Sequence, residues 1–99
     1  MDVFDVLGEP TRRLILEQLS QGERSVNDIV SALRTRSPIS QPAVSQHLKV
    51  LRSADLVAVR AEGTRRLYSL DPVGLEAARA WLTRLVDPLA TFAQPLDAR

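Results

Sequence analysis

The stretch that decides the fold is Ser40-Gln41-Pro42-Ala43-Val44-Ser45-Gln46-His47-Leu48-Lys49-Val50-Leu51. Ser40 is a typical helix N-cap, and Pro42 is tolerated in a first helical turn because its missing N–H needs no partner there. Val44, Leu48 and Leu51 recur at helical spacing, which predicts a helix with one buried stripe. The opposite face of this helix consists of Pro42, Ser45, Gln46, Lys49 and Ser53. It contains no acidic residue, whereas an ordinary solvent face mixes charges of both signs.

A second helix is predicted directly upstream. Ser25 and Asp28 have the spacing of a capping box, which marks a helix start. The apolar face of that helix is then Ile29, Val30 and Leu33. The polar connection at 34–39 contains Pro38, which disfavours continuation of the helix. This connection is longer than the turn of three or four residues that is usual between two such helices. We expect the helix-turn-helix pair at about 26–54.

A β-hairpin is predicted after these helices. The segments 56–60 and 65–70 are rich in β-prone residues, and the segment 61–64, which contains Gly63, joins them. Two helices joined by a turn and followed by a two-stranded ribbon form a winged helix-turn-helix. We expect the wing at about 56–70.

Apolar segments flank this unit on both sides. A short helix is expected at about 2–8, and Pro10 suits the first turn of another helix. Asp71-Pro72 predicts the start of a long C-terminal helix. Its apolar residues recur in steps of three and four, as in a heptad seam: Leu75, Ala78, Leu82, Leu85, Leu89, Phe92 and Leu96. Either this helix kinks at Pro88, or Asp87-Pro88 starts a new helix on the same face.

The seam predicts a homodimer. A subunit of 99 residues leaves too little chain to bury the seam within itself, and pairing across a two-fold axis resolves this. We expect dimerisation elements at about 2–8 and 72–96. The expected interface residues are Val3, Phe4, Leu7, Leu75, Ala78, Trp81, Leu82, Leu85, Leu89 and Phe92.

Length and composition limit the possible fold classes and cellular compartments. One domain over 1–99 is expected, mainly α-helical with a small β-hairpin. The chain has no cysteine, which excludes disulfides and thiolate chemistry. The start Met1-Asp2-Val3-Phe4-Asp5 is acidic, unlike a secretory signal. We expect a cytoplasmic protein, associated with the nucleoid and not with a membrane.

Charge is distributed unevenly along the chain. Residues 1–33 carry six acids and three bases, whereas residues 34–66 carry seven bases and two acids. Residues 67–99 carry three bases and four acids, so the thirds have net charges of −3, +5 and −1. A basic middle segment indicates a polyanionic partner, although a solvated surface is the alternative.

Four segments together resemble the ArsR-type bacterial repressors. They are the opening stretch at 40–51, Gly8-Glu9-Pro10-Thr11-Arg12-Arg13-Leu14-Ile15-Leu16, Ala54-Asp55-Leu56-Val57 and Gly63-Thr64-Arg65-Arg66-Leu67-Tyr68-Ser69-Leu70. The resemblance covers about residues 3–86. It implies a homodimer that binds double-stranded operator DNA and releases it when a metal, a redox event or another signal arrives.

The chain departs from the founding members of that family. These sense metals through cysteine pairs or through His and carboxylate clusters, but here His47 is the only histidine. Glu76 and Asp87 on the last segment have no nitrogen partner, which makes a poor transition-metal site. The chain therefore resembles the branch without metal sensing, often treated as autorepressors, and we expect no metal and no cofactor.

The recognition helix and the wing supply the expected DNA contacts. Gln41, Ser45 and Gln46 suit base edges in the major groove, and Lys49 and Arg52 suit the phosphate backbone. The hairpin arginines either guard an exposed edge or enter the minor groove, with Arg65 favoured for that role and Arg66 open to a structural one. The full expected set is Ser40, Gln41, Pro42, Ser45, Gln46, Lys49, Arg52, Arg60, Arg65 and Arg66.

Two other function classes are alternatives to a DNA-binding repressor. A winged helix that binds a protein partner would show no salt-dependent binding to DNA, and the basic middle third argues against it. An enzyme is not expected, because the sequence has no nucleophile with a base, no suggestive carboxylate pair and no Gly-rich phosphate loop. An unknown apolar effector is a further hypothesis, with Trp81 and Phe92 as its candidate contacts.

Overall fold

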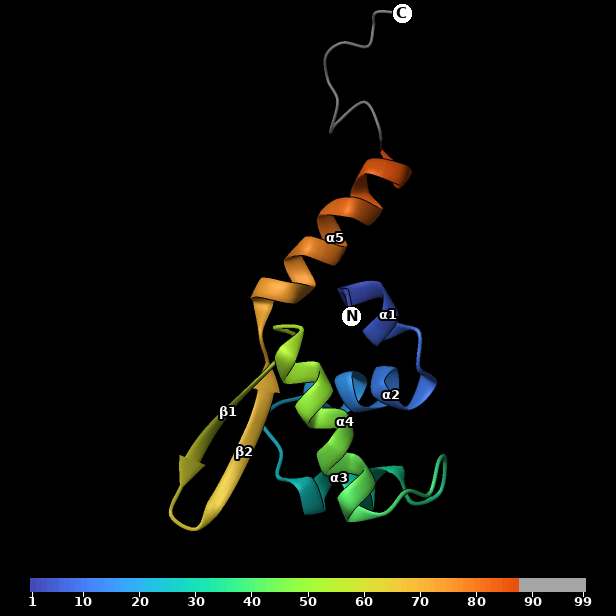
Figure 1. Cartoon of the computed structure of the whole chain (residues 1–99). Coiled ribbons are helices and arrows are strands. Elements are labelled where there is room, and N and C mark those ends of the chain that lie inside the picture. The colour runs from blue at the N-terminus through green and yellow to red at the C-terminus, as the bar shows by residue number, and fades with distance from the viewer. Residues whose placement is uncertain (88–99) are drawn as a thin grey trace, which may run out of the picture.

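The computed structural model describes residues 1–87. Within them, five helices and two strands follow one another (Figure 1). In chain order they are α1 (Val3–Leu7), α2 (Pro10–Leu19), α3 (Val26–Leu33), α4 (Gln41–Ser53), β1 (Val57–Glu62), β2 (Arg65–Leu70) and α5 (Pro72–Val86). The α3–α4 pair followed by the β1–β2 hairpin is a winged helix-turn-helix, so the predicted fold class is confirmed.

Side-chain caps fix the helix starts. Ser25 Oγ accepts the Asp28 N–H at 3.2 Å, and the Asp28 carboxylate accepts the Ser25 N–H at 3.1 Å, so the predicted capping box is present. Ser40 caps α4 by accepting the Ala43 N–H at 3.2 Å. Each cap satisfies N–H groups that have no partner within the helix.

The core lies where α2, α3, α4 and the base of the hairpin meet. Its fully buried side chains include Ile15 of α2, Ile29 and Leu33 of α3, and Val44 and Leu48 of α4. The stripe predicted on α4 is therefore the buried face of that helix. The Pro42-Ser45-Gln46-Lys49 face remains exposed as a consequence.

The hairpin occupies the predicted range, but its first strand extends farther and its turn is tighter than predicted. β1 continues to Glu62, which pairs with Arg65, so the turn consists of Gly63 and Thr64 alone. Gly63 has φ +63°, a conformation that glycine adopts without steric cost. An isolated antiparallel bridge between Arg24 and Tyr68 adds a third backbone segment beside β2. The predicted segment 61–64 is thus partly strand, because a two-residue turn matches the twist of the two strands.

Helix α5 leaves the body in the direction opposite to the hairpin tip (Figure 1). Its first turn is packed tightly against the end of α4. A Cβ atom built on Gly74 would lie 2.5 Å from the Ala54 carbonyl oxygen and 2.6 Å from that of Asp55. The helix ends at Val86 with Asp87 as its C-cap. The expected seam residues Leu89, Phe92 and Leu96, and the alternatives at Pro88, lie outside the described residues.

The described part of the expected dimer interface is only partly covered within one chain. Val3, Leu7 and Leu75 are partly buried against the core, and Ala78 is 5% exposed. Farther along α5, Leu82 is 49% exposed and Leu85 61%. Phe4 packs on Trp81 of the same chain with ring centroids 5.0 Å apart, although both stay about 40% exposed. No helix within residues 1–87 is long and apolar enough to cross a membrane.

Candidate nucleic-acid interface

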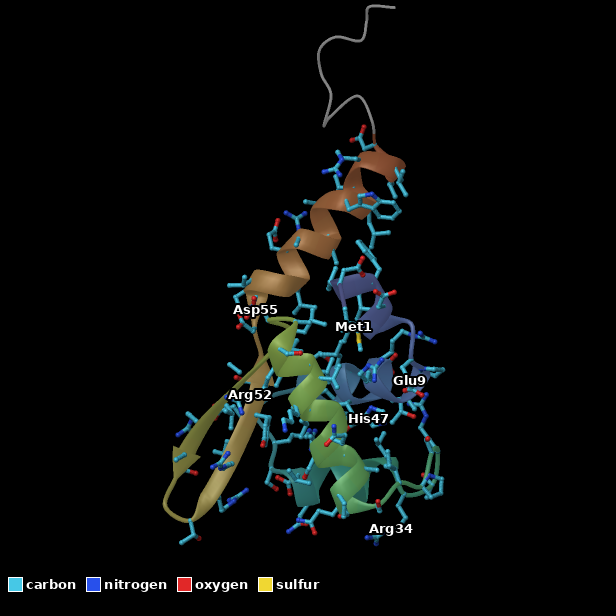
Figure 2. All side chains as sticks on the ribbon, viewed as in Figure 1. Met1, Glu9, Arg34, His47, Arg52 and Asp55 are labelled. Atoms are coloured by element: carbon cyan, nitrogen blue, oxygen red, sulfur yellow. The ribbon has the colours of Figure 1, made fainter. Side chains whose placement is uncertain are left out.

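The outer face of α4 is polar, exposed and free of acids. Ser45, Gln46 and Lys49 are all exposed, and Arg52 continues the face in the last turn. Figure 2 shows Arg34 near the N-terminal end of α4 and Arg52 near its other end. Cations therefore lie at both ends of a helix whose middle presents hydroxyl and amide groups. Gln41 and Pro42 are exposed in the first turn. The Ser40 hydroxyl caps the helix by accepting the Ala43 N–H.

A groove of about 460 Å³ separates α4 from the hairpin. It is lined by residues of three elements and their connections: Ser25, Val26, Asn27, Gln41, Ser45, Thr64, Arg65, Arg66 and Tyr68. The structure thus places four of the expected DNA contacts, Gln41, Ser45, Arg65 and Arg66, along one groove. The groove has five further lining residues that were not among the expected DNA contacts: Ser25, Val26, Asn27, Thr64 and Tyr68.

Two of the three wing arginines are paired with acids. Arg60 donates two hydrogen bonds to the Glu23 carboxylate, at 2.7 and 2.8 Å, and lies 3.7 Å from a Glu62 oxygen. Arg65 lies 3.6 Å from an Asp28 oxygen. The Arg66 side chain has no hydrogen-bond or ion-pair partner among the described residues. Arg66, which the sequence left open to a structural role, is therefore the wing cation most available to a ligand.

The pairings also shift the acid–base equilibria of the groups involved. The hydrogen bonds from Arg60 lower the pKa of the Glu23 carboxyl, and Glu23 raises the pKa of the Arg60 guanidinium. Hydrogen bonds from Ser25 lower the pKa of Asp28, with a smaller contribution from Arg65. All of these groups stay charged at neutral pH. The basic middle third is consequently neutralised in part by Glu23 and Asp28 of the acidic first third.

The inner side of α4 contacts α2 through His47. Its Nδ1 lies 3.4 Å from Nη1 of Arg12, whose Nε donates to the Val6 carbonyl oxygen at 2.8 Å. Arg13 donates to the Leu7 carbonyl oxygen at 2.7 Å. These two arginines satisfy the carbonyls at the end of α1. In Figure 2, His47 lies on the side of α4 nearer Glu9.

Comparison with known proteins gives the family. Residues 9–59 match the model described as "Bacterial regulatory protein, arsR family". The chain is 46% identical over 96 residues to the HTH-type transcriptional regulator Rv2034 of Mycobacterium tuberculosis, covering 96% of this chain and 86% of that protein. It is 30% identical over 86 residues to the transcriptional repressor SdpR of Bacillus subtilis, covering 87% and 91% of the two chains.

Solved structures agree with this assignment. A possible transcriptional regulator for arsenical resistance has 41% identity and a TM-score of 0.75, covering 86% of this chain and 84% of that one. The homodimeric winged helix-turn-helix DNA-binding domain of Mb0332 from Mycobacterium bovis has 34% identity and a TM-score of 0.66, covering 89% and 77%. The chain therefore belongs to the ArsR family of bacterial regulatory proteins, and is a winged-helix transcriptional regulator and not an enzyme.

Proposed function

We propose that this chain is a homodimeric, sequence-specific repressor that binds a palindromic DNA operator. The observation that carries the proposal is the acid-free face of α4, which lies across a groove from the unpaired Arg66. A helix with exposed Gln and Ser side chains can read base edges in the major groove, while flanking cations bind phosphates. In this arrangement Gln41, Ser45 and Gln46 read bases.

The remaining contacts are proposed to fix the register on DNA. Lys49 and Arg52 bind the backbone, where they add affinity and salt dependence but no sequence preference. Arg66 reaches the phosphates or the minor groove beside the wing, with Arg65 next to it along the same groove. Ser40 and Pro42 contribute mainly by starting α4 at the DNA surface.

The homodimer is proposed from the uncovered apolar face of α5. A groove of about 430 Å³ there is lined by Leu7, Leu75, Ala78, Arg79, Leu82, Thr83 and Val86. A second copy related by a two-fold axis covers this groove with the same apolar residues. The relative Mb0332 is described as homodimeric, which supports the same assembly here. Two α4 helices then enter successive major grooves about one DNA turn apart.

Regulation by protein abundance, through the protein's own promoter, is proposed over metal sensing. The sequence has no cysteine and one histidine, and that histidine contacts Arg12, a cation that disfavours a metal ion beside it. An apolar effector beside Trp81 is the competing hypothesis for release. It requires a small molecule that both changes Trp81 fluorescence and dissociates the DNA.

Fluorescence anisotropy of a labelled duplex tests this function. The duplex carries the DNA upstream of the protein's own gene, and a scrambled duplex of the same composition is the control. Tight, salt-sensitive binding that prefers the native duplex is expected, and added Zn²⁺ or Ni²⁺ should leave it unchanged. Equal, weak binding to both duplexes would contradict autoregulation. Absence of any salt-sensitive binding would favour a protein-interaction module instead.

A further inference from the structure

The outer half of the hairpin has no apolar anchor. Every residue from 60 to 66 is exposed. Apolar burial in β2 begins only at Leu67, which is 7% exposed, and at Tyr68, which is 8% exposed. A two-stranded ribbon without a packed face is marginally stable and free to swing. Some other contact must therefore hold the outer half in the position that forms the groove beside α4.

Ion pairs to Glu23 in the connection between α2 and α3, and to Asp28 in the first turn of α3, supply that contact. Glu23 binds both Nε and an Nη atom of Arg60, a two-point geometry that fixes direction as well as distance. The Asp28–Arg65 pair at 3.6 Å is a looser second contact. Both acids belong to the body of the domain and both arginines to the outer half of the hairpin. The pairs therefore cross between two parts that no apolar packing joins.

Glu23 is itself held in place by its neighbour in the chain. The Arg24 N–H donates to the Tyr68 carbonyl oxygen at 3.0 Å, and the Tyr68 N–H donates to the Arg24 carbonyl oxygen at 2.8 Å. This backbone bridge fixes the segment from which the Glu23 side chain extends. The carboxylate is thus a fixed point at the base of the hairpin, and Arg60 is the part that moves if the pair breaks.

Arg60 is poorly placed to bind DNA directly. Its guanidinium is bound by Glu23, and the Nη atom that donates to Glu23 also lies 3.7 Å from a Glu62 oxygen. A phosphate would have to displace one acid and approach another, at an electrostatic cost. Arg66 lies on the opposite face of the hairpin, since it pairs with Ala61 while Arg60 pairs with Leu67. Arg60 and Arg66 therefore have different roles.

We infer that Glu23 is a positioning residue of the DNA interface, which holds Arg66 across the groove from Ser45 by binding Arg60. This inference rests on the proposed function, because it assigns Glu23 a part in DNA binding. Glu23 does not touch the DNA, and it acts through the position of the hairpin. The sign of its effect is unusual, since an acid near a polyanion ordinarily weakens binding.

That sign makes the inference testable with isosteric variants. Glu23→Gln is expected to weaken binding to the native duplex by about two- to fivefold, the range that an exposed ion pair can supply. Arg60→Gln should cause the same loss and leave the salt slope unchanged, because no phosphate contact is removed. The swap Glu23→Arg with Arg60→Glu re-forms the pair and should restore most of the affinity.

Glu62→Gln is the matched control. It removes an acid beside Arg60 and changes the net charge equally, but Glu62 belongs to the hairpin and cannot tie it to the body. No loss of affinity is expected for it. If Glu23→Gln instead strengthened binding, the acids would merely repel DNA and the inference would be overturned. A salt slope lowered by about one in Arg60→Gln would also overturn it, by making Arg60 a phosphate ligand.

Amide hydrogen exchange tests the same inference without DNA. Exchange of the amides at 60–66 should be faster in Glu23→Gln and Arg60→Gln than in the wild type, and should slow again in the swap. Unchanged exchange would overturn the inference even where the wild type binds DNA. If the wild type bound no DNA but the exchange rates changed as expected, the proposed function would be overturned. The Glu23–Arg60 pair would still be shown to position the hairpin.

Discussion

The two ends of the molecule expose opposite kinds of surface. On the α4–hairpin side, the exposed side chains are mostly polar or charged, including the acids Glu23, Asp28 and Glu62 beside the wing arginines, and water satisfies them. On the α1–α5 side, Leu85 is 61% exposed and Val86 84%, and water does not satisfy them. The first surface is stable alone and can exchange its water and ions for phosphate reversibly. The second is stable only under a permanent apolar cover, so the two surfaces should respond to different perturbations.

The largest expected effect comes from placing a charge in the apolar surface. Leu82→Asp would put a carboxylate into the proposed dimer interface, where an unpaired charge is costly. We expect dimer affinity to fall by at least about a hundredfold, corresponding to several kcal/mol. DNA affinity should fall with it, because one subunit reaches only one half-site. Sedimentation velocity and anisotropy on the native duplex measure the two losses.

Ala80→Asp is the matched control for that change. Ala80 is also exposed on α5 but does not line the apolar groove. It should leave the oligomeric state and DNA affinity near those of the wild type. A Leu82→Asp variant that remained dimeric and bound DNA normally would show that the exposed face of α5 is not the subunit interface.

The next largest effect is expected where the first turn of α5 packs against the end of α4. In Gly74→Ala the new methyl group would meet the backbone carbonyls of Ala54 and Asp55, which cannot move aside as a side chain can. It would also strain the 2.7 Å bond from the Gly74 N–H to the Asp55 carbonyl oxygen. We expect a loss of about 1–3 kcal/mol in the free energy of unfolding. Urea denaturation measures it.

Gly8→Ala provides the comparison for that variant. Gly8 has φ −69°, which any residue adopts, and its nearest contact to an added Cβ is 3.3 Å. The free energy of unfolding should therefore change much less than in Gly74→Ala. Equal losses in the two variants would mean that the close approach of α5 to α4 does not limit stability.

A smaller effect, confined to the polar surface, is expected from Gln46→Ala. Loss of a bidentate base contact costs about 1–2 kcal/mol of discrimination. Affinity for the native duplex should fall by about five- to thirtyfold, with little change for the scrambled duplex. Anisotropy titrations of both duplexes at one salt concentration check this. Equal weakening on the two duplexes would make Gln46 a backbone contact.

The features that sequence predicted well are those set by nearby residues. The capping box of Ser25 and Asp28, the buried stripe of α4 and the start of α5 after Asp71 all depend on spacings of a few residues. Local hydrogen bonding and helical periodicity determine such features. The exposed face of α4 followed directly, because the face opposite a buried stripe must meet solvent.

The features that sequence missed depend on contacts between distant segments. Glu23 lies 37 residues before Arg60, and no short-range pattern pairs them. The sequence therefore favoured Arg65 for the minor groove and left Arg66 open to a structural role, whereas the structure pairs the Arg65 side chain with Asp28 and leaves only the Arg66 side chain, of the three wing arginines, without a partner among residues 1–87. The same holds for Asn27, which lines the groove because the hairpin folds back over the start of α3. Tertiary placement decided these roles.

The smallest expected effect concerns Glu9, which caps α2 between the two ends. Its carboxylate accepts the Thr11 N–H, at 2.6 Å, and the Arg12 N–H, at 3.2 Å. Burial raises the pKa of Glu9, but these N–H donors and the nearby His47 and Arg12 lower it below its usual range. A carboxyl with a lowered pKa in the folded state stabilises it fully above the unfolded-state pKa. That stabilisation is lost as the pH falls through the lowered value.

In Glu9→Gln, the free energy of unfolding should therefore fall less steeply than in the wild type as the pH is lowered. At neutral pH it costs about 1 kcal/mol or less, because the Gln oxygen can still accept from the Thr11 N–H. Below the unfolded-state pKa of glutamate, the wild type and the variant should converge. Urea unfolding midpoints between pH 3 and pH 7 measure this pH dependence. Glu17→Gln, which removes an exposed acid later in α2, is the control for net charge. Curves that stay parallel down to pH 3 would mean that the cap acts through its shape, and that the Glu9 charge contributes nothing to folding.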